Sequence, residues 1–305
     1  TGVVTAKGIG DTLIRVIDTT RDIQSAVYVK VIKKQEDMQY EPMVDGGNNH
    51  SVALKGDGTV WAWGYNKYGQ LGNNTTVTTE MPTQVLGKDA NGFLTDIQMI
   101  ASGTNHVLAL KNDGTVWAWG YNNYGQLGDN TQITRYTPVQ VLSEDANSPL
   151  QDIIYIAAGT NYSVAVNKKG EVWTWGQNDY GQLGDGTKTA KYTPVRVKAN
   201  LSGIIKVACG IRHTVALKAD GSVYTWGDNA NGQLSDNTNS QRLIPVKVLE
   251  TADTYLSDAI SISASSYSTH ILKANGTVIS SGLGTSGQLG NNGKVQTYGK
   301  KENHN

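Results

Sequence analysis

The sequence predicts an all-β protein, a β-propeller of four-stranded blades, from three observations. First, a ten-residue phrase occurs five times, at positions 63–72, 119–128, 175–184, 226–235 and, in eroded form, 281–290. Second, its Gly-Gln-Leu core begins at Gly69, Gly125, Gly181, Gly232 and Gly287, so the steps are 56, 56, 51 and 55 residues. Third, short strand-like runs surround each phrase, and no long stretch has helical apolar spacing. Four short strands in a repeat of this length are typical of a propeller blade.

Each unit is predicted to begin with an apolar strand, such as 97–101 or 153–158, followed by a hairpin. The hairpin turns contain pairs that tolerate positive φ: Asp57-Gly58, Asp113-Gly114, Lys169-Gly170, Asp220-Gly221 and Asn275-Gly276. After the phrase, a run led by proline (82–85, 138–141, 194–197 and 245–248) predicts a last strand. Proline has no N–H to donate, so this strand is expected at an edge or to begin at the proline.

Three sub-motifs keep their order and spacing in at least four units: Gly-x-x-His-x-x-Ala-Leu, Asp-Gly-x-Val-x-x-Trp-Gly and Asn-x-x-Gly-Gln-Leu-Gly. This combination resembles the repeat of the regulator of chromosome condensation family over residues 44–293. The resemblance implies a propeller, usually of seven blades, whereas five units are visible here. Three arrangements stay open: two blades are missing, five blades close a smaller ring, or the array is open and its edges pair with another chain.

The two ends of the chain depart from the repeat. Residues 1–33 suggest three strands and resemble the end of a bacterial immunoglobulin-like surface domain; alternatively, these strands close or cap the propeller. Residues 34–43 are the expected linker. Residues 294–305 are polar and lack the Pro-led strand, so we expect a frayed tail.

Charge and cysteine content narrow the functional classes. The 26 basic and 26 acidic side chains cancel, so no basic field exists to attract nucleic acid. No run of 18 apolar residues or signal pattern is present, so we expect no membrane insertion. One cysteine excludes an intrachain disulfide framework. An extracellular or cell-surface location in a bacterium is expected from the resemblance of the N-terminal segment alone.

The repeated large and small residues are predicted to form the structural core. We expect one tryptophan per blade to wedge between blades, at Trp63, Trp119, Trp175 and Trp226. The glycines that follow them are expected to allow close backbone approach or positive φ: Gly64, Gly120, Gly176 and Gly227.

The residues that could bind a metal or act in catalysis are better explained as structural. His50, His106 and His213 share one register with Tyr162 and Ser268, which argues against a symmetric metal site and for hydrogen bonds to a neighbouring blade's backbone. The acidic segments 88–92 and 144–148 lack the ligand density of a calcium loop. Cys209 is interpreted as a small buried residue, and no nucleophile elbow or phosphate-binding loop occurs. We therefore expect no catalytic residues, no metal and no cofactor.

Surface recognition remains, and tyrosines are the best candidates. Tyr65 and Tyr121 occupy a position that varies between units while the repeat pattern holds, so they are predicted partner contacts. In contrast, Tyr68, Tyr124 and Tyr180 are predicted to be structural. Phe93, in the connection 86–96, is the apolar candidate on a second rim.

Three functional hypotheses follow. The favoured one is a non-catalytic module of a bacterial secreted or surface protein that binds another protein or a glycan. By analogy, some relatives are guanine-nucleotide exchange factors and one class inhibits β-lactamases, although uniform blades offer no inserted wedge for exchange. The third is a structural subunit that self-associates through open blade edges.

Overall fold

The computed structural model describes residues 10–18, 23–31, 39–199, 201–251, 253–290 and 297–303 of the 305-residue chain. These residues form one two-stranded sheet and five four-stranded sheets, all antiparallel between neighbours. The predicted all-β fold with five four-stranded blades is confirmed. No helix among the described residues is long and apolar enough to cross a membrane.

Within each blade the strands follow in sequence order. Blade 1 comprises β3 (Met43–Gly46), β4 (His50–Leu54), β5 (Val60–Gly64) and β6 (Thr79–Gln84). Blade 2 comprises β7 (Ile97–Ser102), β8 (His106–Lys111), β9 (Val116–Gly120) and β10 (Arg135–Gln140). Blade 3 comprises β11 (Ile153–Ala158), β12 (Tyr162–Asn167), β13 (Val172–Gly176) and β14 (Lys191–Arg196). Blade 4 comprises β15 (Ile204–Cys209), β16 (His213–Lys218), β17 (Val223–Gly227) and β18 (Arg242–Lys247). Blade 5 comprises β19 (Ala259–Ala264), β20 (Ser268–Lys273), β21 (Val278–Gly282) and β22 (Thr297–Asn303).

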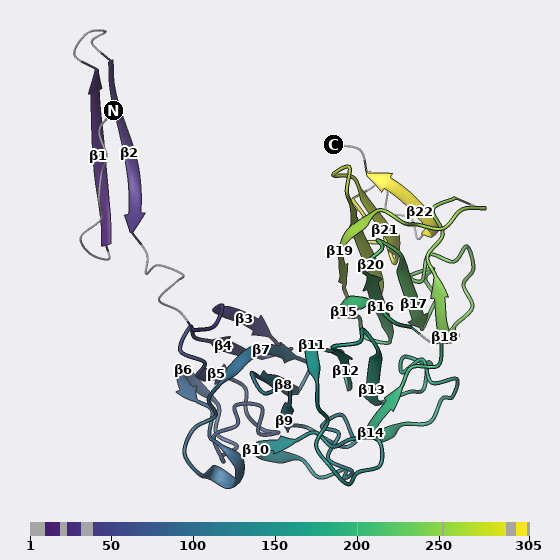
Figure 1. The fold of residues 1–305 in the computed structure, drawn as a ribbon, viewed down its shortest axis with the longest axis horizontal. Helices are drawn as coiled ribbons and strands as arrows, with labels where there is room; N and C mark the ends of the chain where they lie inside the picture. Colours follow the sequence, from purple (N-terminus) through teal and green to yellow (C-terminus); the bar gives the residue numbers. More distant parts are fainter. Residues whose placement is uncertain are drawn as a thin grey trace.

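The five blades follow one another along an open arc (Figure 1). The first strands of successive blades contact each other in the order β3, β7, β11, β15, β19, and no comparable contact joins blade 1 to blade 5. The described residues therefore form a partial or open propeller and not a closed ring of five blades. Each of the two end blades has one face without a neighbouring blade.

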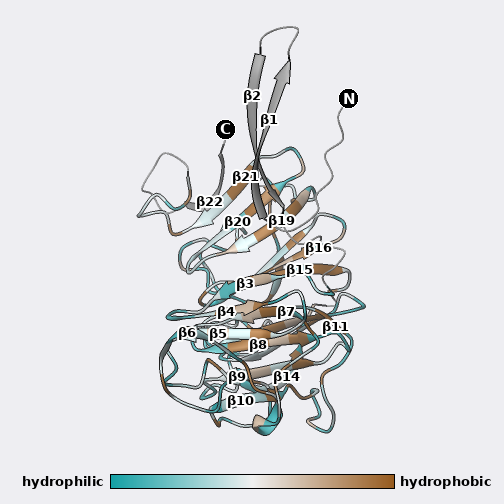
Figure 2. Ribbon diagram, turned by 90° about the vertical axis from the view of Figure 1, so that its left-hand side faces the viewer, coloured by the Kyte–Doolittle hydropathy of each residue, from teal (hydrophilic) through white to brown (hydrophobic). Residues whose placement is uncertain are grey.

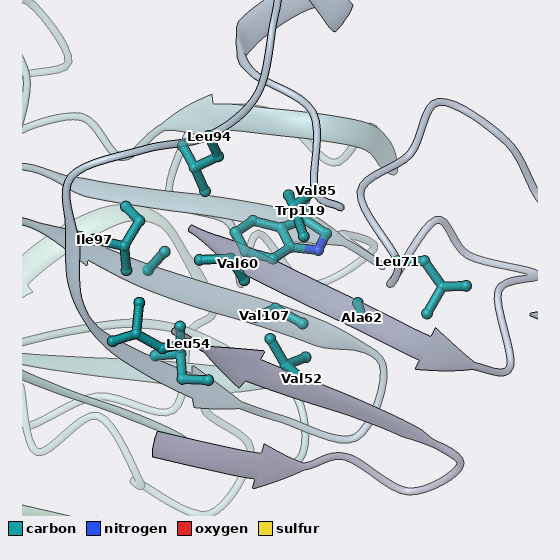
Figure 3. Packing of buried hydrophobic residues seen from close by; sticks show 12 residues of the cluster. Val52, Leu54, Val60, Ala62, Leu71, Val85, Leu94, Ile97, Val107 and Trp119 are labelled. Atoms are coloured by element: carbon teal, nitrogen blue, oxygen red, sulfur yellow. The ribbon is translucent and has the colours of Figure 1, made fainter. Parts of the chain in front are cut away.

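The core lies between blades rather than in one central mass. Hydrophobic residues concentrate on the strands, and hydrophilic residues on many of the connections (Figure 2). In the first junction, Trp119 of blade 2 packs among Val60, Leu71 and Val85 of blade 1, all fully buried (Figure 3). Equivalent clusters form around Trp175 and Trp226. Because neighbouring blades complete each cluster, the blades stabilise each other as repeats in a linear array do.

Both chain ends contain strands. β1 (Gly10–Asp18) and β2 (Ile23–Val31) form a hairpin, and the first of the three expected N-terminal strands falls in residues 1–9, outside the described residues. These two strands pair with each other and belong to none of the five blades, so they do not supply the closing strand considered above. Half of the expected linker, residues 34–38, also lies outside the described residues.

The C-terminal stretch differs from the sequence expectation. In place of a frayed tail, β22 pairs with β21 and gives blade 5 its fourth strand. Its sequence is polar and has no leading proline, but antiparallel pairing uses backbone N–H and C=O groups that every non-proline residue offers. The propeller therefore extends past the predicted boundary at residue 293.

Candidate functional site

Two kinds of loop lie on the same face of the arc, which we call the aromatic face. In each blade, the turn between the first two strands lies beside the loop that follows the third strand. Backbone hydrogen bonds join the two loops, from Tyr65 N to Asn49 O at 2.8 Å and from Tyr121 N to Asn105 O at 2.9 Å. The hairpin tips and the inter-blade connections lie on the opposite face, because antiparallel strands reverse direction at each turn.

Four tyrosines form a continuous row on the aromatic face, the tyrosine ridge: Tyr65, Tyr68, Tyr121 and Tyr124. The ring centroids are separated by 6.3 Å between Tyr65 and Tyr68, 5.0 Å between Tyr68 and Tyr121, and 6.4 Å between Tyr121 and Tyr124. All three pairs are edge-to-face, an arrangement that aromatic quadrupoles favour. Burial and the neighbouring tyrosines raise the pKa of Tyr121, so its hydroxyl is neutral at physiological pH.

The ridge stands on loops that are held rigidly by a buried asparagine. In blade 1, Asn66 is fully buried; its Oδ1 accepts a hydrogen bond from Leu71 N at 3.0 Å, and its Nδ2 donates to Thr75 O at 3.0 Å and Val77 O at 3.2 Å. Tyr68 N donates to Gln70 Oε1 at 2.9 Å. The same arrangement recurs around Asn122, Asn178 and Asn229. Rigid loops lower the entropy that a surface loses on binding.

The phrase that carries the ridge also locks neighbouring blades together. The indole N–H of each wedge tryptophan donates to the glutamine carbonyl of the preceding blade: Trp119 to Gln70 at 3.0 Å, Trp175 to Gln126 at 2.8 Å and Trp226 to Gln182 at 2.8 Å. These three indoles are fully buried. The glycine after the tryptophan is required by its backbone, since Gly64 has φ of +103° and a Cβ there would lie 2.6 Å from Asn49 O.

Trp63 does not fill the predicted wedge position. It is only partly buried, because blade 1 has no preceding blade in the described structure to cover it. Val44 shows the same effect: it is 76% exposed, whereas its register equivalent in blade 2, Ile100, is 1% exposed. A repeat position therefore specifies a contact only where a neighbouring blade is present.

The last junction replaces the tryptophan by a matched pair of serines. Blade 5 has Ser281 at the tryptophan position, and blade 4 has Ser235 where earlier blades have glycine. The two hydroxyl groups are 2.6 Å apart. In the preceding junction a Cβ on Gly184 would lie 2.8 Å from the indole nitrogen of Trp226, so a serine there is compatible only with a smaller partner.

The histidine register is structural, with partners that differ from those predicted. His106 Nε2 lies 3.0 Å from Ser163 Oγ of the next blade, and that hydroxyl donates to Gln126 O at 2.8 Å. His213 contacts Thr269 of the next blade in the same way, at 3.1 Å. Tyr162 bonds a neighbouring backbone as predicted, donating to His213 O at 2.5 Å.

The contacts of the histidines indicate which ring nitrogen carries the hydrogen, and their burial determines the charge. The serine hydroxyl already donates its hydrogen to a carbonyl, so the contacting Nε2 of His106 must donate. Burial lowers the pKa of His106 to about 3 and those of His50 and His213 to about 4. All three rings are therefore neutral at pH 7 and sit inside blade junctions.

The remaining candidates are separate from the ridge. Phe93 is 54% exposed and bridges Leu86 in the connection after blade 1, on the opposite face, next to the helical turn η2 (Lys88–Ala90). Asp145 accepts hydrogen bonds from Ser143 Oγ and Asn147 N, which lower its pKa and hold a turn. No three potential metal-ligating side chains cluster among the described residues.

A pocket of about 270 Å³ is lined by the turns that follow the first strand of each of the five blades. Its lining residues are mostly small and lie in glycine-bearing turns, such as those at Gly47, Gly103 and Gly159. Cys209 lines it too, and desolvation raises the pKa of this thiol to about 12, which keeps it protonated. Cys209 is therefore not an activated nucleophile in this pocket.

Sequence reasoning missed part of the surface. The sequence predicted a structural role for Tyr68 and Tyr124, and their rings also join those of Tyr65 and Tyr121 in one row on the surface. It also missed Arg212, whose guanidinium lies 4.2 Å from the ring centroid of Tyr180. The available signal was that Arg212 replaces an asparagine found at the same register in blades 1 to 3.

Together, the fold and the ridge define a class of protein, a bladed scaffold that offers an aromatic surface and no assembled catalytic group among the described residues. The chain belongs to the RCC1-like domain family, whose profile matches residues 17–302. It is 31% identical over 245 residues to the ultraviolet-B receptor UVR8 of Arabidopsis thaliana, covering 80% of this chain and 53% of that protein. It is 36% identical over 219 residues to the probable E3 ubiquitin-protein ligase HERC4 of Homo sapiens, covering 71% of this chain and 20% of that protein. The chain thus spans about half or less of these relatives.

Solved structures agree on the fold. Yeast RCC1 (Prp20), solved bound to Kap60, superposes with a TM-score of 0.71 at 23% identity, covering 86% of this chain and 61% of that chain. Human WBSCR16 superposes with a TM-score of 0.72 at 21% identity, covering 86% of this chain and 67% of that chain. At these identities the likeness concerns architecture alone.

Proposed function

We propose that this chain is a non-catalytic protein-binding module that contacts its partner through the tyrosine ridge. The observation that carries the proposal is the row of four partly exposed tyrosines on rigid loops. Tyr65 and Tyr121 occur only in blades 1 and 2, where they connect Tyr68 and Tyr124 into one surface. Tyrosine provides a large contact area with few rotatable bonds, which is why it is enriched in binding hot spots.

The family supports protein binding in general terms. Yeast RCC1 was solved in complex with Kap60, and a second structure of that protein is described together with its binding to Gsp1p and histones. Those partners belong to those proteins. For this chain, the proposed partner is another protein, and a surface glycan is the alternative that the same experiment tests.

We further propose that the module acts outside a bacterial cell or at its surface. The support is the resemblance of residues 1–33 to the end of a bacterial immunoglobulin-like domain, together with the β1–β2 hairpin in that segment. Protease treatment of intact cells tests this location: an exposed protein is digested without lysis, whereas an internal one survives until the cells are broken.

Binding by the ridge can be tested with matched variants. The double variant Tyr65→Ala/Tyr121→Ala removes two ridge tyrosines, and Phe93→Ala is the control on the opposite face. Each is immobilised and exposed to an extract and to purified surface glycans of the organism that encodes the chain. We expect a protein captured by the wild type and by Phe93→Ala to be lost from the double variant. Equal capture by all three would reject the ridge as the binding site.

A second candidate, self-association, is favoured by the end faces of the arc. Blade 1 exposes Val44 and part of Trp63, and blade 5 exposes Gln288, whose equivalents in blades 1 to 4 are fully buried. At the two ends of the arc the open surfaces are therefore blade faces, which could associate in addition to the strand edges. Light scattering distinguishes the outcomes: a mass near 32.7 kDa indicates a monomer, while an oligomer that Val44→Asp dissociates supports assembly.

A further inference from the structure

The structure contains an internal example of a cation on a tyrosine of the aromatic face. Tyr68, Tyr124 and Tyr180 hold the same register in blades 1, 2 and 3. Two of these rings are each covered by a side chain from the next blade. The ring centroid of Tyr121 lies 5.0 Å from that of Tyr68, and the guanidinium carbon of Arg212 lies 4.2 Å from the ring centroid of Tyr180.

Among the described residues, no ring or cation of the next blade covers Tyr124 in this way. The blade 3 residues in the registers of Tyr121 and Arg212 are Gln177 and Asn161. These two side chains bond each other, with Asn161 Nδ2 donating to Gln177 Oε1 at 3.1 Å. Tyr124 is 36% exposed, whereas the other three ridge tyrosines are more deeply buried. Its ring contacts Tyr121 at one side of the ridge and ends the row on the other.

The repeat register puts a carboxylate at this end of the ridge, because Gln177 corresponds to Tyr121 and Tyr124 corresponds to Tyr68. Gln177 Nε2 donates to Asp179 Oδ2 at 2.6 Å, which places the Asp179 carboxylate beside the residue that replaces an aromatic cover. Asp179 is exposed, and among the described residues no lysine or arginine forms an ion pair with it. In blades 1 and 2 the same register holds Lys67 and Asn123, so the negative charge is specific to the Tyr124 end.

We propose that the ridge takes a positively charged peptide segment of its partner, with an arginine stacked on Tyr124 and its guanidinium directed toward Asp179. This inference rests on the proposed function and names the chemistry of the partner. The stacked arginine would reproduce at Tyr124 the contact that Arg212 makes within the chain. Arginine fits better than lysine, because its planar group can stack on a ring while its N–H groups bond a carboxylate.

The proposal predicts a defined dependence on the peptide. The probe is a fluorescein-labelled peptide of alternating glycine and arginine, and its matched control has citrulline, which keeps the shape and lacks the charge. With the full chain at low salt, fluorescence anisotropy should show at least about 10-fold tighter binding of the arginine peptide. Binding should weaken with added salt, as expected for exposed charges.

Variants locate the contact. Tyr124→Ala should weaken binding of the arginine peptide about 3- to 10-fold, and Asp179→Asn about 3-fold with a flatter salt dependence. Tyr124→Phe keeps the ring face and should retain binding, which separates lost stacking from a damaged fold. Tyr255→Ala and Asp253→Asn are the matched controls, since both residues are exposed in the connection after blade 4 and should leave binding unchanged.

Two results would overturn the inference. One is equal affinity for the arginine and citrulline peptides; the other is arginine-peptide binding that both Tyr124→Ala and Asp179→Asn leave intact. Failure of the broader proposal is distinguishable from either result. If Tyr65→Ala/Tyr121→Ala still captures every protein that the wild type captures, ridge binding itself is wrong. If capture is lost but the peptide results are negative, the ridge binds a partner of different chemistry.

Discussion

Replacing the wedge tryptophans should reveal which blade faces are covered. Trp175 is fully buried, packs in the junction between blades 2 and 3, and donates a hydrogen bond to Gln126 O. Trp175→Ala should therefore destabilise the protein by about 3 to 5 kcal/mol, from lost apolar burial, a residual cavity and a lost indole hydrogen bond. Trp63 occupies the same register but lies on the open face of blade 1, so Trp63→Ala should cost about 1 kcal/mol or less.

A conservative substitution separates packing from hydrogen bonding. Gln126 O accepts from both Trp175 and Ser163, whereas Gln70 O accepts a side-chain hydrogen bond from Trp119 alone, since the Ser163 register is Val107 in blade 2. Trp119→Phe should thus cost about 1 kcal/mol more than Trp175→Phe.

Urea unfolding followed by far-ultraviolet circular dichroism and by tryptophan fluorescence measures these costs, provided that the two transitions coincide. Equal destabilisation by Trp63→Ala and Trp175→Ala would refute the reasoning. It would mean that blade 1 is covered in solution as completely as the internal blades are.

Three further predictions concern the junctions between blades and the pocket lined by Cys209. Ser281→Trp and Ser235→Gly should each destabilise blade 5. The double variant should recover about 1 kcal/mol or more of the free energy of unfolding in a double-mutant cycle, because the glycine makes room for the indole. Additive effects of the two substitutions would contradict this prediction. Burial lowers the pKa of His50, His106 and His213, so the stability that depends on their neutral rings is complete above pH 6.5 and declines as the pH falls toward 4. At pH 5 each histidine should lower the free energy of unfolding by about 1 to 2 kcal/mol. Urea midpoints that are unchanged between pH 7 and pH 5 would contradict this prediction. Cys209, with its pKa raised to about 12, should react with a thiol reagent at pH 8 at least about 100-fold more slowly than an unfolded control, and equal rates would contradict the assignment.

The blade architecture was predictable because its signals are local. The hairpin pair at Asp57-Gly58 and the phrase around Gly69 specify turns and strand ends within about 20 residues, and the repeat multiplies that evidence. β22 was not predicted, since its polar sequence has neither proline nor alternating apolar residues. Trp63 was misassigned because a register position does not reveal whether a neighbouring blade covers it.

The candidate site was predictable only in part. Variation between units singled out Tyr65 and Tyr121, and their role as partner contacts stays a prediction. Their contact with Tyr68 and Tyr124 depends on how neighbouring blades superpose, which brings together residues more than 50 positions apart. Phe93 lies on the opposite face, because the inter-blade connections leave from the other end of the strands.

The central claim is that the tyrosine ridge serves binding and contributes little to the fold. The most direct measurement determines, for wild type and Tyr65→Ala/Tyr121→Ala, both the free energy of unfolding and the dissociation constant for a captured partner. We predict a loss of about 3 kcal/mol or less in stability, from three edge-to-face pairs worth about 1 kcal/mol each, and at least about 30-fold weaker binding. A variant that unfolds before it loses its partner, or that binds as tightly as the wild type, would contradict the claim.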